Sequence, residues 1–206
     1  MRRSAFRLLF PFSRRLVSLF RPCAPLRLPA TLRAAVGACL AGAVLIACTP
    51  TFDWRTIMND DQGYTVDLPA KPSVDERQID IGGTPVKMSM QTAEAGEVVF
   101  AVGTITLPGD DPQAQHTALE FLRTGLARNL GAAPDSHATQ IPLAAGGQVP
   151  GIEMTFAGKA GPRLEPRTMH ARIVARGRHV YQAVVIAGKE PPPEQVDQFF
   201  ESFKLF

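Results

Sequence analysis

An apolar segment that ends at a cysteine divides this chain into two parts of very different composition. Residues 34–47 carry no charge, and the short stretch Leu45-Ile46-Ala47 leads directly to Cys48. Residues 1–47 contain eight arginines and no acidic side chain. A basic beginning followed by a short apolar run is typical of an export signal and not of a folded domain. The part that can fold is therefore predicted to begin at about Cys48.

The four residues Leu45-Ile46-Ala47-Cys48 match the lipobox pattern, so the chain resembles the bacterial lipoproteins. The resemblance implies a signal peptide cut before Cys48 and a diacylglyceryl group on the cysteine sulfur. It also implies a further acyl chain, such as palmitate, on the new amino terminus. The domain would then be held in the cell envelope, facing the periplasm, with membrane lipid as its first partner. Thr49 follows the cysteine where an aspartate would favour the inner membrane, so the outer membrane is expected.

The same segment leaves an alternative open. Residues 34–47 number 14, fewer than the roughly 20 that cross a bilayer, which favours a cleaved signal. Extended through Phe52, the segment has 19 uncharged residues between Arg33 and Asp53, with the arginines on the cytoplasmic side. The alternative prediction is a single-pass inner-membrane protein that displays the same extracytoplasmic domain.

The mature part differs in charge from the whole chain. The full sequence has a formal net charge of +3. Without the eight leader arginines, 14 of the 22 basic residues remain against 19 acidic ones, a net charge of −5. A protein that binds DNA or RNA needs its basic residues on the folded domain, where they neutralise phosphates. No nucleic-acid partner is therefore expected.

The positions of the cysteines leave the mature part without a disulfide, so its stability has to come from the apolar core. Cys23, Cys39 and Cys48 are the only cysteines, and all lie before or at the predicted cleavage point. The 159 residues that remain have no disulfide, but a chain of that length buries roughly 70% of its unfolded surface. The expected organisation is a signal peptide at 1–47, a lipidated cysteine and tether at 48–61, and a single domain at 62–206.

Alternation of apolar and polar residues predicts eight strands in two groups of four. Turn residues such as Pro69, Gly82-Gly83 and Pro108-Gly109 separate them. The expected strands are 64–68, 74–81, 86–91 and 98–107, followed after a helix by 137–143, 149–156, 167–175 and 178–187.

Two helices are predicted, one after each group of strands. Asp111-Pro112 supplies a capping carboxylate and a proline at the first helical position, and Gly131 ends this helix. Because the strands follow one another through short turns, hairpins dominate, and the expected fold class is α+β, a mainly antiparallel sheet flanked by two helices. The last helix follows Pro191-Pro192-Pro193 and presents, at helical spacing, Val196, Phe199, Phe200 and Phe203.

The order of these elements resembles the Mog1/PsbP-like fold, including the lipoproteins similar to DcrB. Three segments carry the resemblance: an opening strand with a Pro-x-x-Pro element at 63–72, the stretch 178–185, and the closing Phe199-Phe200-Glu201-Ser202-Phe203. It implies an α/β/α sandwich with four strands, a helix, four strands and a helix, in an envelope protein. Members of the family are mostly non-enzymatic or uncharacterised, so the resemblance implies no active-site residue.

The hairpin at 167–187 carries the candidate binding patch. With Arg176-Gly177 as its turn, Arg172 is expected opposite Tyr181. Such a face would bind an anion or a peptide, with Arg172 stacked on Tyr181. The alternative is a face that is solvated or covered by a helix. The patch consists of His170, Arg172, His179 and Tyr181, with Val174 among them.

Neither a metal site nor another cofactor is expected. In that register His170 and His179 lie four residues apart along the strand, about 13 Å, which is too far for one metal ion. His116 and His137 show no ligand spacing, and the mature part offers no free thiol. Between Lys159 and His179 there are six basic residues and one acidic residue, a run that would face anionic lipid, an acidic partner or solvent.

No motif of nucleophilic, metal-assisted or phosphate-binding catalysis occurs in the sequence. The predicted function is therefore a non-enzymatic binding or structural module, anchored in the envelope, with an envelope protein as a possible partner. The alternative from a different class is an enzyme with its site on the sheet face of His170, Arg172 and Tyr181.

Overall fold

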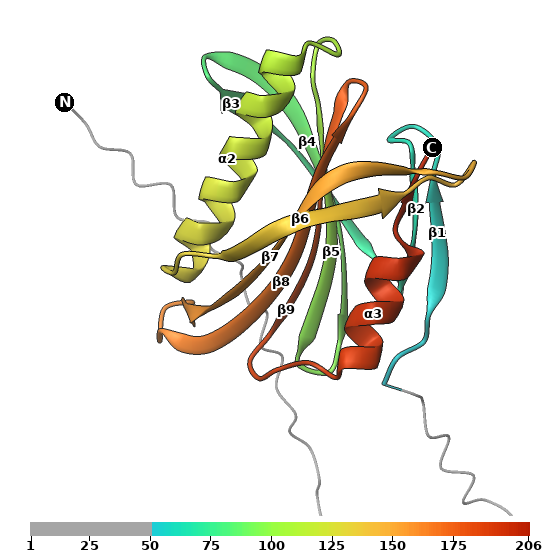
Figure 1. The fold of residues 1–206 in the computed structure, drawn as a ribbon. Coiled ribbons are helices and arrows are strands. Elements are labelled where there is room, and N and C mark those ends of the chain that lie inside the picture. Colours follow the sequence, from blue (N-terminus) through green and yellow to red (C-terminus); the bar gives the residue numbers. More distant parts are fainter. Residues whose placement is uncertain (1–50) are drawn as a thin grey trace, which may run out of the picture. The chain divides into compact units, whose positions relative to one another are not determined.

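The structure is a computed structural model that describes residues 51–206. The predicted signal peptide, Cys48 and most of the alternative transmembrane segment lie outside the described residues. Figure 1 shows the arrangement of the elements, which are in chain order β1 (Arg55–Asn59), β2 (Tyr64–Leu68), β3 (Ser73–Ile81), β4 (Thr84–Ala95), β5 (Val98–Thr106), α2 (Pro112–Leu130), β6 (Asp135–Pro142), β7 (Gln148–Ala160), β8 (Glu165–Arg176), β9 (His179–Ala187), α3 (Pro193–Ser202) and β10 (Lys204–Leu205).

Antiparallel pairs build a seven-stranded sheet in the order β3-β4-β5-β9-β8-β7-β6. The two central strands, β5 and β9, are buried along almost their whole length. They are rich in valine and alanine because both faces of the sheet are covered there. The prediction of an α+β fold with a mainly antiparallel sheet and two helices is confirmed.

Helix α2 covers one side of this sheet, which we call the α2 face. The Asp111 carboxylate accepts a hydrogen bond from the Ala114 amide at 2.8 Å, and Pro112 follows it. Gly131 ends the helix with a φ of 64°, a conformation that glycine adopts without strain. These are the start and end that the sequence predicts. The helix packs on the sheet through Ala118, Leu122, Leu126 and Leu130.

Helix α3 and a second, small sheet cover the opposite side, the α3 face. Successive residues of a strand point to opposite faces, so Ile105 packs in the core with α2 while Val102 packs in the core with α3. Phe199, Phe200 and Phe203 are the aromatic residues that α3 and its end bring to this second core. The small sheet has the order β1-β2-β10, and Figure 1 shows α3 beside it.

The predicted tether at 48–61 is shorter than expected, because the fold already begins at Phe52. Phe52 and Trp54 pack against the core of the α3 face, and the Asp53 amide donates to the Pro69 carbonyl at 2.8 Å. Residues Arg55–Asn59 form β1, which pairs with β2 along its full length. This strand and the two-residue β10 are absent from the sequence prediction.

The predicted register of the β8–β9 hairpin is wrong by two residues. Arg172 lies opposite Ala183, and Val174 lies opposite Tyr181. The two-residue turn is Gly177-Arg178, not Arg176-Gly177. Gly177 has a φ of 55°, and a type II′ turn requires such a residue at its first central position. A shift by two residues leaves every side chain on its predicted face.

Candidate functional site

Two residues of the predicted patch, His170 and Arg172, are engaged by neighbours on the α3 face. The His170 Nε2 atom lies 2.8 Å from the carboxylate of Glu190, which is in the connection between β9 and α3. The Arg172 Nε atom donates to Glu153 on β7 at 2.8 Å. The Arg172 guanidinium lies 4.6 Å from the centre of the Phe200 ring. The predicted stacking of Arg172 on Tyr181 is therefore wrong, because the Arg172 guanidinium lies against Phe200 of α3 instead.

Tyr181 is buried, with 2% of its surface exposed. Its hydroxyl donates to the Gln62 carbonyl in the β1–β2 turn at 2.8 Å. The rings of Tyr64 and Phe203 pack against it edge-on, with centroids 6.2 Å away in both cases. Burial raises the pKa of Tyr181 to about 12, so the phenol stays protonated and serves as a structural donor.

His179 lies apart from His170. His179 lies opposite Arg176 in the hairpin. Arg176 is six residues after His170 along β8, so His170 and His179 are about 20 Å apart at the usual strand rise. Burial lowers the pKa of His179 below its usual value of 6.5, and the charge of Arg178 lowers it further. The four patch residues therefore do not form one site. Within residues 51–206, no three His, Cys, Asp or Glu side chains are grouped closely enough to hold a metal ion.

The structure instead shows a polar cavity of about 430 Å³ on the α3 face, close to His179. It opens between the β1–β2 turn and the sheet strands β3, β4 and β5. Its floor includes Ser89 and Gln91 on β4, which are 3% and 9% exposed. Asp61, Glu76, Lys87 and Arg178 supply its charged lining.

Two buried polar atoms of β4 and β5 have no hydrogen-bond partner in the protein. Gln91 Oε1 is buried and has no partner. Thr104 Oγ1 is also buried without a partner, and Thr104 lies directly opposite Ser89 in the β4–β5 pair. An unsatisfied buried acceptor costs about 1–3 kcal/mol. Both atoms are enclosed, so they lower the stability of the fold locally and are not shown to lie on the accessible wall of the cavity.

The charged lining of the polar cavity is balanced in sign. Lys87 Nζ lies 2.9 Å from Glu76 Oε2, across the β3–β4 pair. Asp61 and Arg178 make no ion pair with any residue of 51–206. One acidic and one basic side chain therefore remain available to a ligand.

The sequence pattern of β4 contains a signal for this cavity that is easily misread. Along β4, the polar side chains Lys87, Ser89 and Gln91 alternate with Val86, Met88 and Met90. A polar face of a strand normally faces solvent. Here the β1–β2 turn and the edge strand β3 enclose it, because the 55–62 segment folds over the sheet.

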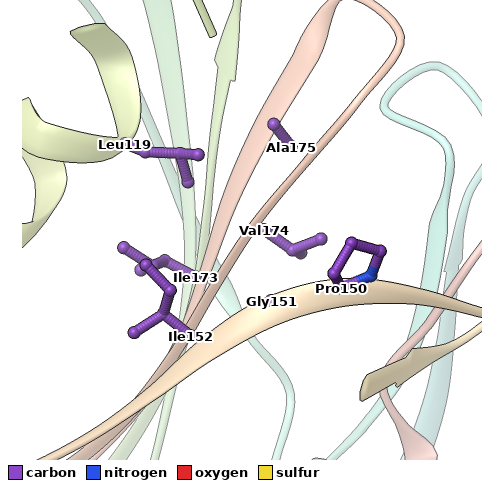
Figure 2. Close-up of a pocket in the computed structure, with 7 residues that line it drawn as sticks. All are labelled: Leu119, Pro150, Gly151, Ile152, Ile173, Val174 and Ala175. Atoms are coloured by element: carbon purple, nitrogen blue, oxygen red, sulfur yellow. The ribbon is translucent and has the colours of Figure 1, made fainter. Parts of the chain in front are cut away.

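A second, apolar hollow of about 190 Å³ lies between α2 and the sheet, where β7 leaves β8 (Figure 2). The pairing of β7 with β8 stops at Ile152 and Ile173. Pro150, two residues earlier, has no amide hydrogen to offer to a neighbouring strand. The lining has no charged side chain, and it consists of Leu119, Pro150, Gly151, Ile152, Ile173, Val174 and Ala175.

The chain enters the fold at the end of the sheet that is opposite to the polar cavity. The Thr51 methyl carbon lies beside Gly96, in the turn from β4 to β5. Phe52 and Trp54 stack on each other and meet Phe100 edge-on, at centroid distances of 6.2 and 5.6 Å. Strand β5 runs from Val98 at this end of the sheet to Thr106 at the cavity. These two residues are eight positions apart, about 26 Å at the usual strand rise.

The basic run between Lys159 and His179 does not form one patch. Arg167 pairs with Glu165 at 2.8 Å beside the β7–β8 turn, and Arg172 pairs with Glu153. Arg176 donates to the carbonyl of Phe206, and Arg178 lines the polar cavity. The positive charges are therefore spread over both ends of the sheet, and several are already paired.

No protein-family model matches this chain, and no curated protein matches it at a significant level. Neither helix of residues 51–206 has both the length and the apolar character that crossing a membrane requires.

Proposed function

We propose that this chain is a lipoprotein of the bacterial cell envelope, anchored through Cys48, whose domain is a non-enzymatic binding module. The observation that carries the proposal is the position of Phe52 and Trp54. These aromatic residues dock on Phe100 directly after the lipobox, so the fold begins where a cleaved and acylated chain would begin.

The connection from anchor to domain is short. Only Thr49 and Pro50 separate Cys48 from Thr51, and three extended residues span about 10 Å. An anchor at Cys48 therefore requires no tether beyond these residues, because the chain already packs into the core at Phe52.

The lipid chains would supply a durable attachment. Each buried methylene contributes about 0.8 kcal/mol, so two or three acyl chains anchor the protein where one would exchange. With threonine after the cysteine, we propose the outer membrane, facing the periplasm, as the site of attachment.

The order of elements supports the finer, Mog1/PsbP-like part of the proposal. Between Tyr64 and Ser202 the chain forms four strands, a helix, four strands and a helix. The strand β1 before this order and β10 after it form the small sheet with β2. A domain of this kind serves as a binding module, and its polar cavity is the surface feature that best fits that role.

Metabolic labelling with palmitate tests the anchor. We expect the wild-type chain to be labelled and the Cys48→Ala variant to lose the label. Cys39→Ala is the matched control, because it removes a cysteine nine residues earlier and should keep the label. Equal label in the Cys48→Ala and wild-type proteins would exclude acylation at this residue.

The single-pass alternative predicts a different response to signal peptidase II inhibition. A lipoprotein should accumulate as a larger precursor, whereas a transmembrane protein should keep its size. The enzyme alternative gains no support from the geometry, because His170, Arg172 and Tyr181 are occupied by Glu190, Glu153 and the Gln62 carbonyl.

A further inference from the structure

We infer that Met58 is a site of reversible oxidation, at which an oxidant of the peroxide class converts the thioether to a sulfoxide that a dithiol-dependent reductase can remove. This modification goes beyond the proposed binding module and does not depend on it. The supporting observations are the exposure of the methionines, the place of Met58 in the small sheet, and the chemistry of its sulfur.

The methionines of residues 51–206 differ widely in exposure. Met58, on β1, is 66% exposed. Met90 is half-buried, and its Sδ atom accepts a hydrogen bond from the Gln182 amide at 3.9 Å. The other three lie in the core under α2 and are between 0% and 5% exposed: Met88, Met154 and Met169. An oxidant in water has to reach the sulfur, so Met58 is the methionine of this set that reacts first.

Met58 lies on the outer face of the small sheet. Successive residues of a strand point to opposite faces, and Ile57, its neighbour, packs against the core of the α3 face. Met58 pairs with Thr65 on β2, and Thr65 pairs with Lys204 on β10. The row of side chains that contains Met58 is otherwise polar, so an added oxygen atom meets polar groups and water.

The reaction is a two-electron transfer of one oxygen atom. The Met58 sulfur attacks one oxygen of hydrogen peroxide, the S–O bond forms as the O–O bond breaks, and the hydroxide that leaves takes up a proton to become water. The return step consumes two thiols. The sulfoxide oxygen leaves as water, the sulfur regains its two electrons, and the thiols are oxidised to a disulfide.

The fold is expected to tolerate a sulfoxide at this position. Met58 is largely exposed before the reaction, so little buried apolar area is lost when the side chain becomes polar. In a directly opposed antiparallel pair the Cβ atoms lie about 5 Å apart, so the Thr65 hydroxyl can donate to the new oxygen. Oxidation of Met154, by contrast, would place a polar oxygen in the apolar core. Met58 can therefore be oxidised and repaired while the protein stays folded.

Peptide mapping by mass spectrometry after peroxide treatment tests the inference. The full protein, in a peroxide-free non-ionic detergent, is treated with hydrogen peroxide, and the gain of one oxygen atom is followed at each methionine. We expect Met58 to be oxidised at least about tenfold faster than the three methionines of the core, because a buried sulfur reacts only in molecules that have opened locally. In denaturing urea the rates should become similar. Equal rates in the folded protein, or a slower reaction at Met58 than at Met90, would overturn the assignment.

Variants identify the reacting sulfur. Met58→Leu keeps the approximate size of the side chain and removes the sulfur, so the fast phase of oxygen uptake should disappear. Met90→Leu is the matched control and should keep that phase. The unfolding temperature of the wild-type protein should be the same before and after the fast phase. A marked decrease would show that the fold does not tolerate the sulfoxide and would contradict a reversible site.

Incubation of the folded, oxidised protein with methionine sulfoxide reductases tests the return step. Enzymes for both sulfoxide epimers, supplied with a dithiol, should restore reduced Met58. Sulfoxide that persists at Met58 in the folded protein and is reduced only after digestion would overturn the reversibility. The mass of the peptide that contains Met58 is read independently of the palmitate label and of any bound ligand. Failure of the anchor and failure of the oxidation site are therefore separate results.

Discussion

The two ends of the α3 face are built from the same strands and differ in what covers them. Near the chain entry, a row across the sheet contains Ala93, Phe100 and Val185, and α3 packs aromatic rings onto it. Four residues further along, the corresponding row contains Ser89, Thr104 and Tyr181, which are also buried, and the polar cavity opens beside it. We call these the closed end and the open end.

The difference separates the part of this sheet face that stabilises the fold from the part that leaves polar groups without partners. At the closed end, burial of large apolar side chains stabilises the fold by about 1.5–3 kcal/mol for each. At the open end, buried hydroxyl and amide groups without partners offset part of this stabilisation. The open end therefore contributes less to the stability of the fold than the closed end.

The largest effect is expected from Phe100→Ala at the closed end. Phe100 is fully buried and meets the rings of Phe52, Trp54 and Phe199. Truncation of a buried phenylalanine costs about 3–5 kcal/mol, because a cavity replaces the ring. Denaturant unfolding measures the loss.

Phe121→Ala is the control for this variant. The Phe121 side chain is 40% exposed on α2, so its truncation should change the unfolding free energy by much less. If the two variants were equally stable, the aromatic cluster would not be the support of the closed end, and the docking of Phe52 and Trp54 would lose its energetic basis.

A smaller effect is expected from the two ion pairs of this face. Arg172 and Glu153 have side chains that are 21% and 25% exposed, and Phe200 covers the guanidinium. Glu153→Gln leaves that guanidinium without its counter-charge and should lower the free energy of unfolding by about 1–2 kcal/mol.

Lys87 and Glu76, at the rim of the polar cavity, are 57% and 48% exposed. Water screens this pair, so Glu76→Gln should cost no more than about 0.5 kcal/mol. Chemical denaturation of both variants at the same ionic strength measures the difference. A larger loss at Glu76 than at Glu153 would contradict the expectation that the more buried ion pair contributes more to stability.

Local signals in the sequence predict most of the fold. The Asp111 cap, Pro112 and Gly131 bound α2, and alternating residues locate the strands of the large sheet, because these features act through the chain itself. The β8–β9 register is different. The tripeptide Arg176-Gly177-Arg178 admits two two-residue turns, and only the positive φ of Gly177 at the first central position distinguishes them.

The candidate site escapes prediction because tertiary contacts create it. Ser89 and Gln91 have the spacing of a solvent-facing strand, and they become a cavity floor only when the 55–62 segment folds over them. Because that segment follows the apolar leader, its sequence predicts only a tether. His170 and Arg172, which the sequence groups with His179 and Tyr181, instead contact Glu190, Glu153 and Phe200, none of which the sequence pattern brings near them.

The one effect of opposite sign is expected from Thr104→Val at the open end. The Thr104 hydroxyl is buried without a partner, so a methyl group of the same shape should leave the protein equally stable or stabilise it by up to about 1 kcal/mol. Ser202→Ala is the contrasting control, because the Ser202 hydroxyl accepts from the Asp67 amide and donates to the Phe199 carbonyl, both at 2.8 Å. Its loss should destabilise the protein by about 1–2 kcal/mol. Thermal unfolding of both variants decides the point: a Thr104→Val protein that is clearly less stable than the wild type has lost a hydrogen bond to ordered water, and the open end would then be a hydrated part of the core and not a surface held ready for a ligand.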